Sequence, residues 1–346
     1  MREEIIAHAP TRVDLIGGTL DIWPIYSVLP SAATINIGIP LFARVKVRLC
    51  DEPFFHIRSL DQGKEIRGHW QDVLADEGAL PLAALVLREF WREDLPGLDI
   101  EMKAESPQGA GVGGSSSLAI CLAGALSKVK EMCSSDSFPA EEELVRVVTG
   151  LETRLLHTPT GTQDHWAALR GGLNLIRYSP GGPLVETIRQ DPFQDSPWSM
   201  ILCDSGKSRC SGINNWHVFR AFFDGDVEVV AKFQEIARLS TAALAAAERG
   251  QMDGVLELSH QEWLVRKTLA KEIETDESRY LDQISQQEGA LFSRICGAGG
   301  GGVMAIFVPK EREASVRARL GSAGARLYPS EVCIRGLVFS EKNESA

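Results

Sequence analysis

Residues 105–120 read ESPQGAGVGGSSSLAI, a glycine-rich run that passes into three serines and then into an apolar helical pattern. Glycines let backbone amides approach an anion closely, because no Cβ stands in the way. The amides at the start of a helix then point at one place, and the helix dipole adds partial positive charge. The stretch therefore predicts an anion-binding loop between a strand and a helix. Without a ligand, the same residues would form only a tight strand–helix turn.

Two well-known phosphate loops fit this stretch poorly. Gly109, Gly111 and Gly114 satisfy the G-x-G-x-x-G pattern of dinucleotide-binding folds. Those folds place a second strand after the helix, with an acidic residue about 20 residues on, whereas residues 134–145 lead into another helix. A Walker A loop also fails, because the Gly-Lys-Ser at 206–208 lacks a glycine five residues earlier. A dinucleotide-dependent dehydrogenase is therefore the least favoured of the alternative functions.

Strands and helices flank the loop in segregated runs. Apolar alternation predicts strands at residues 5–18, 35–50 and 98–106. Helical spacing predicts helices from Leu80, over residues 115–133, over residues 139–157 and from a capping Asp226 to Gly250. This segregation predicts an α+β architecture. The composition around DPFQDSP, residues 191–197, predicts a boundary between one domain of residues 1–190 and another of residues 191–346.

The overall composition excludes several classes of function. The 346 residues carry a formal net charge of −11, which argues against nucleic acid as the partner but leaves room for a phosphorylated small molecule. The seven cysteines are scattered and form no CxxC pair, so a zinc site is disfavoured and reduced thiols are expected. Neither a signal peptide nor a membrane-spanning apolar run is visible. We expect a cytoplasmic monomer or homodimer without membrane partners.

Three ordered motifs resemble those of one enzyme family. Residues 107–117, PQGAGVGGSSS, resemble the P-x-G-x-G-L-G-S-S-A motif of the GHMP kinases, which include galactokinase, homoserine kinase and mevalonate kinase. Residues 9–21, APTRVDLIGGTLD, resemble the family's first motif, and residues 297–302, GAGGGG, resemble its third. Four further stretches resemble the sugar kinases that include D-glycero-D-manno-heptose 7-phosphate kinase and the fucokinases. They are residues 17–27, 159–176, 204–211 and 260–267.

The resemblance implies a fold and an activity. An N-terminal domain like ribosomal protein S5 domain 2 and a C-terminal ferredoxin-like domain would form an active site between them. ATP and Mg²⁺ would be the cofactors, and the γ-phosphate would pass to a hydroxyl, the anomeric one, of a sugar or a sugar phosphate such as a heptose 7-phosphate. Two alternatives stay open: a kinase for a mevalonate- or homoserine-like alcohol, and a GHMP-fold protein that binds a ligand without catalysis.

The resemblance also assigns roles to single residues. Asp164 matches the catalytic aspartate, which can accept the proton of the attacking hydroxyl; its plain alternative is a helix cap. Arg12 matches a basic residue that can orient Asp164 or offset phosphoryl charge, and its plain alternative is a surface arginine. Glu152 and Ser115 match the acid and the serine that hold Mg²⁺, which needs only a few hard oxygen ligands besides phosphate and water.

The remaining implied residues bind nucleotide or substrate. The residues expected around the phosphates are Pro107, Gly109, Gly111, Gly113, Gly114, Ser115, Ser116 and Ser117. The residues expected around the substrate are Gly18, Thr19, Asp21, Asp164, Gly299 and Gly300. Asp21 suits this role because a carboxylate accepts hydrogen bonds from sugar hydroxyls. Lys207 and Arg209 could bind a substrate phosphate or could be ordinary surface charges.

Several positions depart from the family pattern. Gly18 and Thr19 replace the Glu-His pair of galactokinase-like enzymes, which argues against galactose as the substrate. Gly114 replaces the first of the paired serines, Leu20 replaces a threonine, and Arg294 replaces a lysine. None of these changes alters Asp164, but together they leave the identity of the sugar open.

Overall fold

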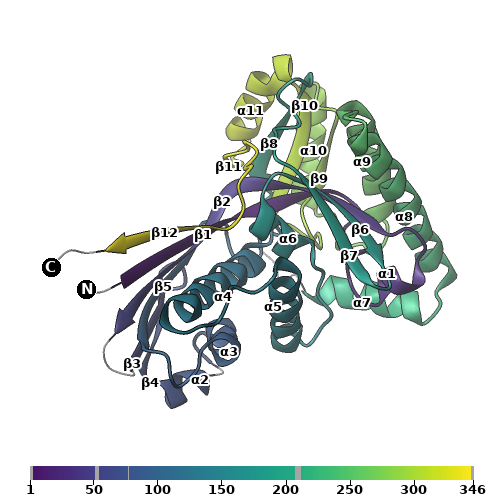
Figure 1. Ribbon diagram of the computed structural model, residues 1–346. Helices are drawn as coiled ribbons and strands as arrows, with labels where there is room; N and C mark the ends of the chain where they lie inside the picture. Colours follow the sequence, from purple (N-terminus) through teal and green to yellow (C-terminus); the bar gives the residue numbers. More distant parts are fainter. Residues whose placement is uncertain (1–2, 51–53, 77, 207–211, 344–346) are drawn as a thin grey trace.

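The computed structural model describes residues 3–50, 54–76, 78–206 and 212–343. Lys207 and Arg209, considered above as phosphate ligands, therefore lie outside the described residues. Within these ranges the chain forms two β-sheets flanked by helices (Figure 1). No helix in the described ranges is both long enough and apolar enough to cross a membrane.

The larger sheet has eight strands from the first half of the chain and from its end. They are β1 (Glu3–Ile16), β2 (Ala33–Cys50), β3 (Phe54–Ser59), β4 (Lys64–His69), β5 (Gly97–Ala104), β6 (Leu173–Ser179), β7 (Gly182–Ile188) and β12 (Val338–Asn343). The order is β12-β1-β2-β5-β3-β4, with β6 paired to β2 and to β7. Strand β2 has 18 residues, so it pairs with β6 near its start, with β5 near its end, and with β1 along most of its length.

The second half of the chain forms a four-stranded antiparallel sheet and a set of helices. The strands are β8 (Trp198–Asp204), β9 (Phe292–Ile295), β10 (Val303–Pro309) and β11 (Leu327–Tyr328), in the order β11-β8-β10-β9. The helices are α7 (Gly212–Phe223), α8 (Val227–Glu248), α9 (Met252–Arg266), α10 (Asp276–Gln287), α11 (Glu313–Ser322) and the 3₁₀ turn η1 (Lys310–Arg312). Asp226 caps α8 as predicted, because its carboxylate accepts hydrogen bonds from the amides of Glu228 and Val229.

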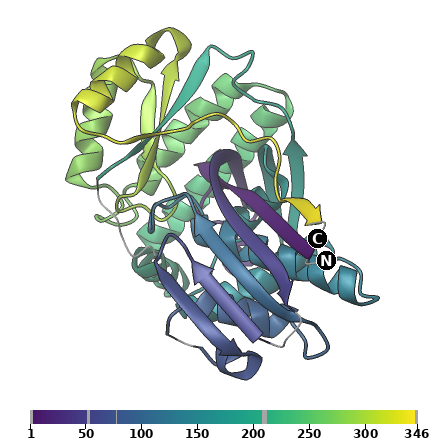
Figure 2. The same ribbon diagram turned by 90° about the vertical axis from the view of Figure 1, so that its left-hand side faces the viewer.

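Helix α4 is the central helix of the first half. The helices there are α1 (Ile25–Val28), α2 (Trp70–Leu74), α3 (Pro81–Phe90), α4 (Gly114–Cys133), α5 (Glu141–Leu156) and α6 (Gln163–Arg170). Most residues of α4 are buried, because it packs on β1 and β2 and is flanked by α3, α5 and α6. Figure 2 shows β1 and β2 in front of these helices. The packing places the N-terminus of α4 beside residues 10–12 of β1, since the Arg12 amide donates to the Val112 carbonyl and the Ser117 hydroxyl to the Pro10 carbonyl.

The predicted elements around the glycine-rich loop are confirmed. Strand β5 ends at Ala104 and α4 begins at Gly114, so the loop joins a strand to a helix. The two largely antiparallel sheets with segregated helices also confirm the α+β class. The boundary near residue 190 stays a proposal. It falls between β7 and β8, and the last strand, β12, pairs with β1 of the larger sheet.

Candidate active site

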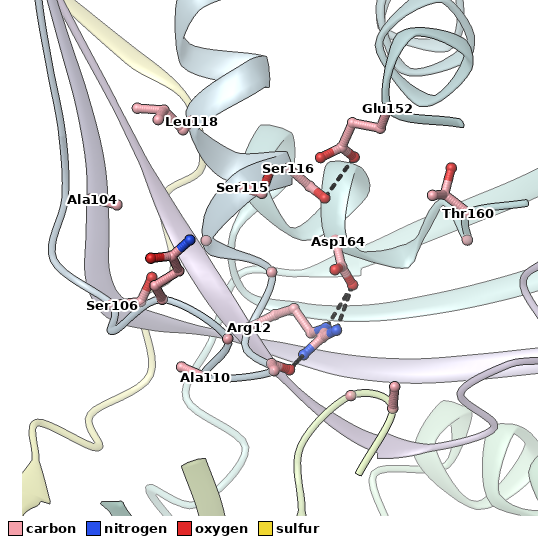
Figure 3. A pocket seen from close by; sticks show the side chains of 18 of the residues that line it. Arg12, Ala104, Ser106, Ala110, Ser115, Ser116, Leu118, Glu152, Thr160 and Asp164 are labelled. Carbon is pink, nitrogen blue, oxygen red and sulfur yellow. Dashed lines mark hydrogen bonds and ion pairs between the residues drawn. The ribbon is translucent and has the colours of Figure 1, made fainter. Parts of the chain in front are cut away.

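A cavity of about 810 Å³ lies at the start of α4 (Figure 3). The glycine-rich loop and the turn of residues 18–22 both line it. It gathers most residues that the sequence assigned to phosphate, metal and substrate. The assigned residues that line it are Arg12, Gly18, Thr19, Asp21, Pro107, Gly109, Gly111, Gly113, Gly114, Ser115, Ser116, Glu152 and Asp164. Residues as far apart in the chain as Arg12 and Asp164 thus face one space.

The glycine-rich loop presents backbone rather than side chains to this cavity. Gly111 and Gly113 have φ values of +75° and +78°, which L-residues rarely adopt. A Cβ at Gly111 would also collide with the carbonyl of Cys296, and one at Gly113 would lie 3.0 Å from the Asp164 carboxylate. Gly113 is the N-cap of α4 and offers no side-chain cap, so the first amides of the helix stay available to an anion.

Asp164 is held by a buried arginine from β1. The Arg12 Nε donates to Asp164 Oδ1 at 2.8 Å, and Nη2 lies 2.6 Å from the same oxygen, while Nη1 donates to the Gly111 carbonyl. Burial alone would lower the pKa of Arg12, but the charges of Asp164 and Asp14 raise it above its ordinary value. Arg12 is only 4% exposed, and Thr162 is the N-cap of α6. The surface-arginine and helix-cap alternatives are therefore wrong.

Glu152 lies beside the serines at the start of α4. The Ser116 hydroxyl donates to Glu152 Oε2 at 2.8 Å, and the Ser115 hydroxyl also interacts with this carboxylate. His165 Nε2 lies 2.7 Å from Glu152 Oε2. Burial favours the neutral carboxyl, yet the His165 charge and the two hydroxyls lower the pKa of Glu152 below its ordinary value. Burial likewise lowers the pKa of His165, but the Glu152 charge raises it overall. Glu152 is therefore a carboxylate at neutral pH.

These groups fit a magnesium ion that also binds phosphate oxygens. One buried carboxylate and the exposed Ser115 hydroxyl provide hard oxygen ligands at a helix N-terminus. In the described part of the chain, no group of three or more His, Cys, Asp or Glu side chains could hold a metal by itself. A metal held by Glu152 and Ser115 would take its remaining ligands from a bound phosphate and from water.

Asp21 is a second carboxylate on the cavity wall. It is 3% exposed, and its Oδ2 accepts a hydrogen bond from the Gln163 amide at 3.1 Å. A Cβ at residue 161 would collide with this carboxylate, so Gly161 lets the backbone pass close to it. Burial, followed by the nearby charge of Asp164, raises the pKa of Asp21 from 3.8 to about 6.

A buried set of charges connects the 18–22 turn to the second half of the chain. Arg266 of α9 donates to the Gly18 carbonyl and lies 3.3 Å from Thr19 Oγ1, while its Nε donates to Glu262 at 2.7 Å. Arg294 of β9 bridges Glu262 at 3.2 Å and Asp14 at 3.1 Å. Thr19 has a φ of +71°, so the contact with Arg266 helps to hold an unfavourable turn conformation.

Two family models match this chain. The model of the GHMP kinases N-terminal domain matches residues 79–172, and that of the GHMP kinases C-terminal domain matches residues 243–326. Together they cover about half of the chain. The chain belongs to the GHMP kinase family. The family that the motifs indicated is therefore confirmed.

Known proteins similar to this GHMP kinase include sugar kinases. The bifunctional fucokinase/GDP-fucose pyrophosphorylase of Arabidopsis thaliana is 24% identical over 94% of this chain and 32% of its own length. The D-glycero-alpha-D-manno-heptose 7-phosphate kinase of Campylobacter jejuni is 21% identical over 88% of this chain and 89% of its own. The crystal structure of a D-glycero-D-manno-heptose 1-phosphate kinase from Bacteroides thetaiotaomicron aligns with a TM-score of 0.76 at 19% identity, covering 99% of this chain and 100% of that one. This chain thus spans about a third of the fucokinase relative and most of the heptose kinase.

Three residues assigned to the site of this GHMP kinase lie outside the cavity lining. The Ser117 hydroxyl is buried and donates to the Pro10 carbonyl at 2.8 Å, so it is already used within the fold. In the third motif, the Gly300 amide donates to the Ile273 carbonyl, and Gly299 packs against the same residue. The preceding residues of that motif, Gly297 and Ala298, line the cavity instead.

Four contributing residues were not found from the sequence. His165 follows Asp164 directly, but neither its burial nor its ion pair has a local signature. Glu262 and Arg266 were noticed only within the stretch HQEWLVRK, and Asp14 only within the first motif. Each of these four side chains contacts a residue on another structural element, and the sequence alone does not reveal such contacts.

Replacing Asp21 by asparagine is expected to change how the stability of this GHMP kinase depends on pH. Between pH 3.8 and about 6, folded Asp21 keeps a proton that the unfolded chain releases. Wild type should therefore lose about 3 kcal/mol of unfolding free energy relative to Asp21→Asn as pH rises through this range. Urea unfolding of both proteins at pH 4, 5, 6 and 7 measures the difference. A difference that stays constant across this range contradicts the expectation.

Proposed function

We propose that this GHMP kinase transfers the γ-phosphate of ATP to a hydroxyl, the anomeric one, of a sugar or a sugar phosphate such as a heptose 7-phosphate. The observation that supports it most is the convergence of Asp164, Arg12 and the N-terminus of α4 on one cavity. The named relatives, a fucokinase and a heptose 7-phosphate kinase, support a sugar as the acceptor.

In this proposal, the glycine-rich loop and the first turn of α4 bind the triphosphate. The loop brings its backbone near the phosphates, and the free amides of the helix donate hydrogen bonds that the helix dipole strengthens. Ser115 and Glu152 would hold Mg²⁺, which offsets the negative charge of the phosphates when it is bound. Phosphoryl transfer depends mainly on positioning and charge stabilisation, so a site built from amides and few side chains suits it.

Asp164 would accept the proton of the attacking hydroxyl. Both contacts from Arg12 go to Oδ1, so Oδ2 stays available for the substrate hydroxyl. Arg12 would fix the orientation of this carboxylate, and its charge would also act on the transferring phosphoryl group. Asp21, with Gly18 and Thr19, lines the same cavity and would accept hydrogen bonds from other hydroxyls of the sugar.

The proposal is tested by ADP release from ATP over a panel of acceptors. The panel contains fucose, other free sugars, heptoses, heptose phosphates, mevalonate and homoserine, each measured with Mg²⁺ and with excess EDTA. We expect turnover with at least one sugar or sugar phosphate, lost with EDTA. Turnover with mevalonate or homoserine alone would contradict the sugar assignment, and no turnover with any acceptor would contradict catalysis.

A further inference from the structure

Ser106 is a largely buried serine on the cavity wall that the motifs did not single out. It follows β5, is 8% exposed and lines the cavity beside the N-terminus of α4. Within residues 3–50, 54–76, 78–206 and 212–343, its hydroxyl has no hydrogen-bond partner. Ser106 Oγ is not among the fully buried polar atoms that lack a partner, so this oxygen is open to the cavity and can bond a ligand there.

The space around Gly114 shows where the Ser106 hydroxyl lies. It is the first residue of α4 and does not have a positive φ, so its backbone conformation would accept a side chain. A Cβ at this position would nevertheless lie 2.1 Å from Ser106 Oγ, much closer than non-bonded atoms approach. The Ser106 hydroxyl therefore occupies the space in which a side chain of residue 114 would begin.

The neighbouring groups that the structure describes make no hydrogen bond to Ser106, so its hydroxyl can bond a bound anion. The adjacent carboxylate of Glu105 accepts a hydrogen bond from the Phe42 amide at 3.0 Å and pairs with Arg44 at 3.0 Å. The amides at the start of α4 have no side-chain cap. In Figure 3, Ser106 and the Ser115–Ser116 pair are both drawn among the residues that line the cavity. A hydroxyl donor beside free helix amides is a suitable environment for a phosphate.

We propose that Ser106 is a phosphate-binding residue, whose hydroxyl donates a hydrogen bond to a phosphate oxygen of the nucleotide bound at the start of α4. Its hydroxyl takes the place that a side chain at residue 114 would otherwise fill. This inference rests on the proposed ATP-dependent function and adds a residue to its nucleotide site.

The space shared by residues 106 and 114 allows a swap experiment. Ser106→Ala removes the hydroxyl, and adding Gly114→Ser returns one from the other side of the same space. The double variant Ser106→Ala with Gly114→Ala is the matched control, since it restores the volume without a hydroxyl. Calorimetry measures Mg·ATP binding to each full-length protein without an acceptor, and thermal unfolding of the ligand-free proteins monitors the fold.

We expect Ser106→Ala to weaken Mg·ATP binding about tenfold with an unchanged ligand-free melting temperature, because one hydrogen bond to a charged group is lost. The variant with serine at 114 should recover most of this loss, and the variant with alanine should not. Wild-type affinity of Ser106→Ala for Mg·ATP, or equal affinities of the two double variants, would overturn the role of Ser106 but not the proposed function. Failure of wild type to bind Mg·ATP would overturn both this role and the proposed function.

Discussion

Replacing Asp164 by asparagine is expected to lower kcat on the best acceptor by at least about a hundredfold, the range for losing a general base. Asparagine has nearly the same shape, but its amide cannot take the proton of the attacking hydroxyl. The pair with Arg12, at 2.6 Å, is also weakened, so the side chain is held less firmly. Steady-state kinetics should show the loss in kcat, with Mg·ATP affinity within about threefold of wild type because Asp164 would not bind phosphate.

The matched control is Asp136→Asn. Asp136 also pairs with an arginine, Arg92, at 2.8 Å, but both side chains are more than 40% exposed and lie outside the cavity lining. A surface pair contributes little, so this variant should keep wild-type kcat. Full activity of Asp164→Asn would contradict the base assignment. A loss of kcat matched by an equal loss of Mg·ATP affinity would point to a damaged nucleotide site and would contradict it as well.

Much of the fold around the site could be predicted from local sequence patterns. The alternation before residue 105 and the helical spacing after residue 114 predicted a strand, a loop and a helix, and all three are confirmed. The motifs named Arg12 and Asp164 but could not show that they touch. These residues are 152 positions apart, and the packing of α6 against β1 brings them to hydrogen-bonding distance. Their catalytic roles stay predictions.

The rest of the site could not be predicted because it depends on burial. In the sequence, Glu262 and Arg266 look like polar residues on the surface of a helix, since charged side chains are almost never fully buried without a partner. The fold buries both, together with Arg294, at 3% exposure or less. Ser106 gave no signal because a serine before a proline is common in loops, and its significance depends on the absent side chain of Gly114.

Glu262→Gln is expected to lower the free energy of unfolding by about 3–5 kcal/mol, the range for removing one member of a buried ion pair. Glu262 is 0% exposed; it accepts a hydrogen bond from Arg266 at 2.7 Å and forms an ion pair with Arg294 at 3.2 Å. Glutamine keeps the shape and some hydrogen bonds but removes the charge. Asp14 would then be the carboxylate left beside Arg294, and Arg266 would lose its closest negative partner. Urea unfolding of wild type and variant measures the change.

Glu235→Gln separates the effect of burial from that of charge removal. Glu235 pairs with Arg238 at 2.7 Å on α8, but the two side chains are 41% and 62% exposed, so its loss should cost less than about 1 kcal/mol. The buried variant should also weaken binding of the acceptor, because Arg266 holds the Gly18 carbonyl and Thr19 of the turn that lines the cavity. If Glu262→Gln proves no more destabilising than Glu235→Gln, these buried charges do not join the two halves of the chain as argued. A large loss of stability with unchanged acceptor affinity would instead mean that these buried charges stabilise the second half of the chain but do not hold the turn that lines the cavity.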